Sequence, residues 1–233
     1  VIDIKMIYKE ALTNNIFNHI CNCADELGIE SYVIGGFVRD YIIDNSTAKD
    51  IDIVVVGDGI EFAKHVSKKL KNTPKVTIFK TYGTAMFKYN DMEIEFVGAR
   101  KESYTKESRN PKVSVGTLED DQNRRDFTIN SMAFSLNKMN YGALVDPFNG
   151  LADIENKVIR TPLSPEITYN DDPLRMLRAI RFATKLDFKI NEDSLISIHN
   201  LSSRIKIITK ERVIVEINKI LLADKPSIGF ISV

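Results

Sequence analysis

The sequence has very few of the side chains that hold soft metal ions or form disulfides. Its 233 residues include only two cysteines and three histidines. Cys21 and Cys23 are two residues apart in a segment expected to be helical, where they face different ways and cannot easily form a disulfide, as suits a reducing compartment. His19, His65 and His199 are scattered without ligand spacing, which argues against a zinc site.

Net charge and long apolar runs are also missing. The 32 basic and 32 acidic side chains cancel, so an anionic partner would have to meet a local basic patch rather than the field of the whole protein. No apolar run reaches membrane-spanning length, and the first residues, VIDIKMIYKE, lack the basic-then-apolar pattern of a secretion signal. We therefore expect a cytoplasmic protein of one or two globular domains with no membrane partner.

The spacing of apolar and turn residues predicts an α/β arrangement up to about residue 100. Gly28 is a typical residue for the end of a helix, so the amphipathic segment before it predicts a helix over 5–28. Further helices are predicted at 37–44 and 59–71, and strands at 31–34, 50–56, 76–79, 84–89 and 93–97. The polar stretch 101–116 has no periodicity and predicts a mobile loop.

Beyond this stretch the sequence predicts one more helix and a strand hairpin before it becomes helical. Thr117 and Asp120 resemble a capping box for a helix that ends near Arg125. Segments 131–136 and 143–145 predict a hairpin around 140–142. After Asp146 the strand signal stops, and helices are predicted at roughly 172–186, 192–201 and 209–223. This change predicts an α/β domain over 1–160, with a mixed sheet, and a helical domain over 161–233.

A pair of acids at the start of a buried strand is the first candidate for chemistry. Side chains alternate in a strand, so Asp50 and Asp52 point to one face. Glu93 and Glu95 share a face on a later strand. Three such carboxylates could hold two Mg²⁺ ions about 4 Å apart, the arrangement used for nucleotidyl transfer. The alternative, that these acids are only solvated at the edge of a strand, stays open.

Two glycines strengthen the metal hypothesis. Gly35 and Gly36 follow a predicted strand and precede a predicted helix, an arrangement in which backbone N–H groups can approach a phosphate closely. Arg39 lies one helical turn further on and could add a positive charge. A glycine pair alone is most often a turn. Beside two acids about a dozen residues away, it indicates a phosphate and metal site.

Five motifs in order give the sequence a family resemblance. They are GGFVRD at 35–40, DID at 50–52, RRDFTIN at 124–130, LVDPFNG at 144–150 and DDPLRMLRAIRF at 171–182. Together they resemble the class II tRNA nucleotidyltransferases, or CCA-adding enzymes, and the related bacterial poly(A) polymerases. The resemblance extends over about 31–223. It implies a polymerase-β-like nucleotidyltransferase head, followed by a helical neck and the start of a body, with further body and tail domains expected outside this chain.

The resemblance implies a role for each matching residue. Asp50 and Asp52 would be the metal ligands for two Mg²⁺ ions, and Glu95, rather than Glu93, would be the third catalytic carboxylate. Arg124 is a weaker candidate than its neighbour for contact with the triphosphate. The nucleotide would be bound by the remaining motif residues: Gly35, Gly36, Arg39, Arg125, Asp172, Arg175, Arg178 and Arg181. At position 171 the family often has glutamate where this chain has aspartate, and that residue is given no role.

The residues of the last motif also have plain structural explanations. Asp172 before Pro173 is a good helix start, with an acid as N-cap and proline in the first turn. Arg175, Arg178 and Arg181 recur every three residues and could simply form a solvated face.

The activity implied by the resemblance is addition of CCA to tRNA 3′ ends from CTP and ATP. Asp172 and Arg175 could select the base, because C and A both present an amino donor beside a ring-nitrogen acceptor. CC-only addition, A-only addition and poly(A) tailing share these motifs and remain alternatives. A non-catalytic RNA-binding module is a further alternative, although it would not need all three acids.

Overall fold

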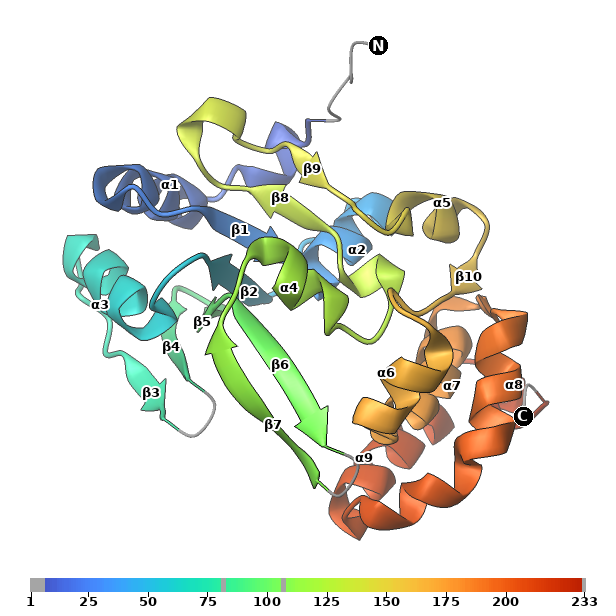
Figure 1. Ribbon diagram of the computed structural model, residues 1–233. Helices are drawn as coiled ribbons and strands as arrows, with labels where there is room; N and C mark the ends of the chain where they lie inside the picture. Colours follow the sequence, from blue (N-terminus) through green and yellow to red (C-terminus); the bar gives the residue numbers. More distant parts are fainter. Residues whose placement is uncertain (1–6, 81–82, 106–107, 232–233) are drawn as a thin grey trace, which may run out of the picture. The chain divides into compact units, whose positions relative to one another are not determined.

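The computed structural model describes residues 7–80, 83–105 and 108–231, and these divide into two compact units (Figure 1). The first unit contains the described residues up to 101, with 113–122 and 130–147. The second contains 102–112, 123–129 and the described residues from 148 onwards. No helix in these described ranges is both long enough and apolar enough to cross a bilayer.

A seven-stranded mixed sheet forms the centre of the first unit. Its strand order is β3-β4-β5-β2-β1-β8-β9, in which β2 and β5 are parallel and the other neighbours are antiparallel. The strands are β1 (Ser31–Ile34), β2 (Asp50–Val55), β3 (Thr77–Phe79), β4 (Thr84–Tyr89), β5 (Met92–Gly98), β8 (Ala133–Ser135) and β9 (Leu144–Val145). The mixed α/β fold predicted for this part is confirmed.

Helices α1 (Asn15–Leu27), α2 (Gly36–Asp44) and α3 (Gly59–Lys69) complete the apolar core of this unit. Ile51, Ile53 and Phe96 point to one face of the sheet and are at most 1% exposed. Phe62 of α3 packs edge-on against Phe96, with ring centroids 5.9 Å apart. On the other face Val54 packs with Leu118 of α4 (Leu118–Asn123). The alternation of β2 therefore separates the face under α3, with Ile51 and Ile53, from the face that carries the acids and Val54.

The N-terminal helix is shorter than the sequence predicts. Residues 5 and 6 lie outside the described residues, Lys9–Leu12 is a separate 3-10 turn, and α1 begins at Asn15. The break arises because Asn14 caps α1, its side chain accepting from the N–H of Ile16 at 3.1 Å. The prediction of a single helix over 5–28 is wrong at its start. Its end is confirmed, since Gly28 has φ 63°.

The predicted mobile loop at 101–116 is also wrong. Strands β6 (Arg100–Thr105) and β7 (Ser108–Val115) form a two-stranded sheet, and 106–107 lie outside the described residues. Strand prediction relies on alternating apolar residues, whereas backbone hydrogen bonds alone can hold a two-stranded ladder. The capping box that follows is confirmed, because the N–H of Asp120 donates to Oγ1 of Thr117 at 3.2 Å.

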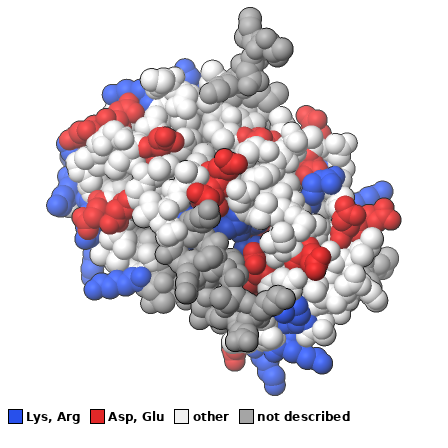
Figure 2. Space-filling model, viewed as in Figure 1, with Lys and Arg blue, Asp and Glu red and all other residues white. Residues whose placement is uncertain are grey.

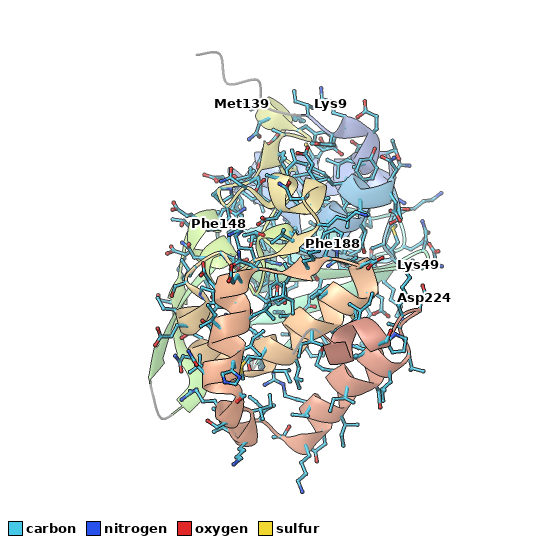
Figure 3. The ribbon with its side chains drawn as sticks, turned by 90° about the vertical axis from the view of Figure 1, so that its right-hand side faces the viewer. Lys9, Lys49, Met139, Phe148, Phe188 and Asp224 are labelled. Atoms are coloured by element: carbon cyan, nitrogen blue, oxygen red, sulfur yellow. The ribbon has the colours of Figure 1, made fainter. Side chains whose placement is uncertain are left out.

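The predicted hairpin at 131–145 is confirmed as β8 and β9. A 3-10 turn at Lys138–Asn140 joins the strands, and Met139 at its centre is 99% exposed. Figure 3 labels Met139 near the top of the molecule. Charged side chains of both signs are interspersed on the face drawn in Figure 2, in keeping with the zero net charge.

The second unit is mainly helical. Its core contains Phe127, Ile159, Tyr169, Ile180 and Phe182, so residues from before and after position 160 pack together. Its helices are α5 (Gly150–Glu155), α6 (Pro165–Asp171), α7 (Leu174–Leu186), α8 (Glu192–Leu201), α9 (Lys210–Leu221) and α10 (Ser227–Ile231). A short parallel pair, β10 (Val158–Ile159) with β11 (Lys189–Ile190), joins them. The three helices predicted for this part are confirmed, and the sequence reading missed the shorter elements. A domain boundary at residue 160 stays a prediction.

Candidate active site

The predicted carboxylates lie on one face of two adjacent parallel strands. Asp52 on β2 is paired in register with Glu95 on β5, and Asp50 is paired with Glu93. Asp50 and Asp52 are exposed, and Glu95 is half-buried. The register is fixed because the intervening residues are buried in the core on the other face, so a shift by one residue would turn the acids inward.

Glu93 and Glu95 differ in the charge of the residue opposite them on β4. Glu93 forms an ion pair with Lys88, its cross-strand neighbour on β4, at 2.8 Å. The hydrogen bond from Lys88 to Glu93 raises the pKa of that lysine. The corresponding neighbour of Glu95 is Met86, which brings no charge. This difference favours Glu95 over Glu93 as the third acid.

The carboxylates suit Mg²⁺ by their chemistry, although they are not gathered around one point. Hard oxygen ligands from Asp50, Asp52 and Glu95 are what this ion prefers. Across 7–80, 83–105 and 108–231, no three acidic, histidine or cysteine side chains are close enough together to form a metal site. The fit therefore rests on donor type and shared face, and an ion would have to draw the side chains together.

The glycine pair lies beside these acids. Ile34, the last residue of β1, is paired in register with Asp52, and Gly35 follows it. Gly35 has φ 81° and ψ −131°, a left-handed backbone that glycine adopts without strain. Its N–H donates to the carbonyl of Met132 at 3.3 Å. A phosphate at the start of α2 would therefore meet the N–H of Gly36 rather than that of Gly35.

Arg39 points into the first unit rather than out of it. It is 5% exposed, its Nε donates to the carboxylate of Asp40 at 2.6 Å, and its guanidinium donates to the side chain of Asn130 at 2.6 Å. Since Asn130 ends the RRDFTIN motif, Arg39 connects that segment to α2. Arg39 therefore bonds to the protein in this structure, and its contact with the nucleotide stays a prediction.

The RRDFTIN segment is anchored by alternate residues. Asp126, Thr128 and Asn130 are 8%, 1% and 6% exposed. Within the second unit, Thr128 donates its hydroxyl hydrogen to Asp153 at 2.7 Å. The sequence reading singled out only the arginines of this motif. The small polar residues placed between apolar ones in DFTIN were the available signal for a buried, hydrogen-bonded segment, which ends in a 3-10 turn at Thr128–Asn130. Arg125, at the start of the segment, is partly exposed.

Asp172 performs the helix-capping role predicted for it. Its Oδ1 accepts from the N–H of Leu174 at 3.1 Å, and Pro173 between them has helical angles. Its other oxygen accepts from Arg212 of α9 at 3.0 Å. Both carboxylate oxygens therefore have protein partners in this structure.

Arg175 likewise bonds to the protein itself. Its guanidinium donates to the carbonyl of Arg124 at 2.6 Å and to that of Thr168 at 3.4 Å. The first bond attaches α7 to the segment that carries Arg125. Arg175, one of the predicted base-reading pair, thus bonds to the residue next to Arg125, the predicted triphosphate residue, within the second unit.

Arg178 and Arg181 do not form a solvated face. Arg178 pairs with Asp126 at 2.6 Å, and Arg181 pairs with Glu216 at 2.6 Å and lies 4.1 Å from the ring centroid of Phe182. Burial acts to lower the pKa of Arg178, but the nearby carboxylates of Asp126 and Glu216 raise it on balance. The arginine ridge is an internal charged cluster.

The sequence did not predict that Glu216 and Arg212 of α9 pair with charged residues of the DDPLRMLRAIRF motif. Glu216 is only 4% exposed, and Arg212 lies one turn before it on α9. A signal was present, because Glu216 falls between Val213 and Ile220 on the inward-facing stripe of the helix. An acid on such a stripe is buried, and a buried carboxylate needs a partner.

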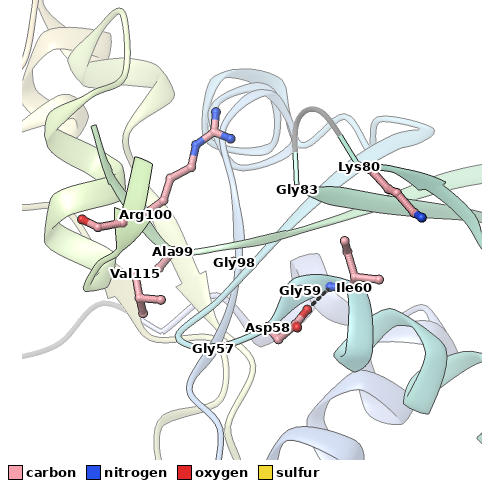
Figure 4. Close-up of a pocket in the computed structure, with 11 residues that line it drawn as sticks. Gly57, Asp58, Gly59, Ile60, Lys80, Gly83, Gly98, Ala99, Arg100 and Val115 are labelled. Atoms are coloured by element: carbon pink, nitrogen blue, oxygen red, sulfur yellow. Dashed lines mark hydrogen bonds between the residues drawn. The ribbon is translucent and has the colours of Figure 1, made fainter. Parts of the chain in front are cut away.

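A cavity of the first unit lies away from these residues. It has a volume of about 440 Å³ and is lined by Gly57, Asp58, Gly59, Gly98 and neighbouring residues at the far ends of β2 and β5 (Figure 4). Asp58 caps α3 there, accepting from the N–H of Ile60 at 2.9 Å. A Cβ on Gly59 would lie 2.6 Å from the backbone N of Gly98, so glycine permits the close packing. None of the predicted site residues lines this cavity.

Comparison with known proteins identifies the family. The model of the poly(A) polymerase head domain matches residues 31–160, and that of a probable RNA- and SrmB-binding site of polymerase A matches 187–232. The chain belongs to the class II tRNA nucleotidyltransferase and poly(A) polymerase family. The family resemblance inferred from the sequence motifs is confirmed.

Named relatives and solved structures of this family are similar to this chain over most of its length. The A-adding tRNA nucleotidyltransferase of Aquifex aeolicus is 42% identical over 166 residues, 71% of this chain and 20% of the relative. The CCA-adding enzyme of Pediococcus pentosaceus is 35% identical over 207 residues, 88% of this chain and 50% of the relative. A crystal structure of a tRNA nucleotidyltransferase with a primer tRNA and an incoming ATP analogue has a TM-score of 0.79 at 34% identity, covering 91% of this chain and 58% of that one. Similar CCA-adding enzymes have been solved with ATP and with CTP. This chain spans a fifth to a half of the length of the two curated relatives.

Proposed function

We propose that this chain carries the catalytic part of a tRNA nucleotidyltransferase that adds CCA to tRNA 3′ ends from CTP and ATP. The observation that carries the proposal is the register of β2 and β5, which places Asp50, Asp52 and Glu95 on one exposed face beside the glycine pair. Relatives in the same family are named for CCA addition or A addition, and one was solved with a primer tRNA. A head at 1–160 and a neck from 161 belong to the proposal.

Asp50 and Asp52 would hold two Mg²⁺ ions, with Glu95 as the third carboxylate. When bound, the ions supply charge that favours ionisation of the terminal hydroxyl of the RNA and stabilises the leaving pyrophosphate. The protein itself would orient the triphosphate through the N–H of Gly36 and the guanidinium of Arg125. Arg39 would keep Asn130 and α2 in place, because its donors are bonded inside the unit.

Base selection would be performed by Asp172 and Arg175. Asp172 can accept from the amino group of C or A, and Arg175 can donate to the adjacent ring nitrogen. U and G present the opposite pattern, and each buried group left unpaired would cost about 1–3 kcal/mol. Both residues have partners in the protein, so a base would have to displace Arg212 from Asp172 or share its carboxylate. Arg178 and Arg181 would support the pocket from their ion-paired positions.

A-only addition is the second candidate function. It is favoured by the 42% identity to an A-adding enzyme, which exceeds the 35% identity to a CCA-adding one. A non-catalytic RNA-binding module would have no need for three carboxylates on one face.

The deciding experiment supplies the full chain with Mg²⁺ and three tRNA transcripts, ending in the discriminator base, in C or in CC. Each transcript receives each of the four nucleotides separately. CCA addition predicts that CTP extends the first two and ATP extends the third. Extension of the CC-ending transcript alone would assign A-only addition. If no nucleotide is added to any transcript, the enzymatic proposal is wrong.

A further inference from the structure

The outer edge of the first unit carries a local excess of lysine. Residues 59–80 contain six lysines and one acid, Glu61, in a chain with 32 basic and 32 acidic side chains overall. Figure 2 shows blue side chains along the edge formed by α3 and β3. Lys64 and Lys69 pair with Glu61 and Glu26. In the part of the chain that the structure describes, Lys71 and Lys75 have no ion-pair partner.

This edge is aligned with the carboxylates across the sheet. Asp52 is paired with Glu95, Glu95 with Met86, and Met86 with Thr77 of β3. Cross-strand partners point to the same face, so the side chain of Thr77 shares the face of the acids. Three strand spacings separate Thr77 from Asp52, a distance of about 14 Å. Phe79, two residues on, points to that face too and is 39% exposed.

The lysines lie at the end of the sheet where β2 begins. Helix α3 starts beyond the far end of β2 and returns, so the connection from α3 to β3, residues 70–76, comes back to the row of Asp52 and Thr77. Lys71 and Lys75 are exposed on this connection. The hydroxyl of Ser67 donates to the carbonyl of Pro74 at 2.5 Å, which fixes the connection against α3. The lysines are therefore held on a defined backbone.

We propose that the β3 edge, with Lys71, Lys75 and Phe79, binds the RNA strand leading to the 3′ end that reacts at the carboxylates. Lysine side chains along a backbone path and an exposed aromatic ring for stacking are the elements of single-strand RNA surfaces. The inference rests on the proposed function for the identity of the RNA. An acidic protein would match the charge as well, but it would not explain the alignment of the edge with the acids.

The test measures binding of a labelled tRNA transcript lacking its terminal adenosine to the full chain, without nucleotide, over a series of salt concentrations. The variant is Lys71→Gln with Lys75→Gln. The matched control is Lys9→Gln with Lys138→Gln, which removes two lysines beside β8 and β9 at the opposite edge of the sheet; Lys9 is labelled in Figure 3. All four positions are exposed, and neither pair belongs to the proposed catalytic residues.

Binding at about 50 mM salt is expected to weaken about 10- to 100-fold in the edge variant, and the log–log salt slope to fall by about two. The control should stay within about twofold of the wild type. Equal effects of the two variants would overturn the proposal and leave the lysines as protection of an edge strand. Competition by poly-glutamate as strong as that by unlabelled tRNA would also overturn it. Because this assay needs no catalysis, its failure is distinct from a failure of nucleotide addition.

Discussion

Replacement of Glu216 by glutamine should destabilise the second unit far more than its surface exposure suggests. The carboxylate is 4% exposed and makes a 2.6 Å contact with Arg181 and a 3.8 Å contact with Arg178. Glutamine keeps the volume and one acceptor oxygen but removes the charge. The loss of this ion pair with a largely buried arginine, whose side chain is 13% exposed, costs about 1.5–3 kcal/mol.

The expected loss of stability is smaller than for a fully buried ion pair, because both arginines keep another partner. Removing one partner of a fully buried ion pair can cost about 3–5 kcal/mol. Arg178 retains Asp126, however, and Arg181 retains the ring of Phe182. We therefore expect Glu216→Gln to lower the free energy of unfolding by about 2 kcal/mol.

The measurement is urea unfolding followed by far-ultraviolet circular dichroism, with Glu211→Gln as the control. Glu211 lies on the same helix and is exposed, so the control removes the same charge from α9 without touching the cluster. A double-mutant cycle with Arg181→Gln should show a coupling of about 1–2 kcal/mol. If Glu216→Gln and Glu211→Gln change the stability equally, the buried cluster contributes no net stability and the reasoning fails.

Three further outcomes are expected. Asp52→Ala should abolish nucleotide transfer while nucleotide binding falls less, because the transition state needs both ions more than the ground state does; Glu93→Ala is the control, and equal losses in the two variants would contradict the assignment. The double replacement Asp172→Ala, Arg175→Ala should raise UTP and GTP incorporation relative to CTP and ATP, whereas a proportional loss with all four nucleotides would make the pair structural. Burial raises the pKa of Tyr169 to about 12, so the neutral hydroxyl favours the folded state fully below pH 10, and this stabilisation is lost as the pH rises towards 12. The wild type should therefore lose about 2–3 kcal/mol more unfolding free energy between pH 10 and pH 12 than Tyr169→Phe, as measured by urea unfolding at the two pH values.

The sequence was informative where side-chain alternation and burial agree. In DIDIVV each second residue enters the core, so the strand, its face and the exposure of Asp50 and Asp52 all follow from the pattern. The parallel pairing of β2 with β5 does not follow from the pattern. It brings Glu95 rather than Glu93 next to Asp52, and only the register shows this. The shared face was predictable, whereas the pairing required the structure.

Misses occurred where hydrogen bonding outweighs apolar periodicity. Strands β6 and β7 lack an alternating apolar pattern, so the segment read as a loop. Asn14 interrupts an otherwise amphipathic stretch because a side-chain cap can begin a new helix in the middle of an apolar pattern. Buried acids such as Glu216 were not predicted, because a charged residue in a sequence is assumed to be exposed to solvent.

The arginines show most clearly what a motif leaves undetermined. A motif identifies residues needed for a site, and it does not distinguish those that touch the ligand from those that hold the site together. Arg39, Arg178 and Arg181 each have a carboxylate partner at 2.6 Å, and moving any of these side chains onto a phosphate would leave that acid, two of the three of them buried, without its counter-charge. That cost opposes direct contact. Arg125 is the motif arginine best placed to bind phosphate, because it is partly exposed at the start of a segment whose later residues are anchored.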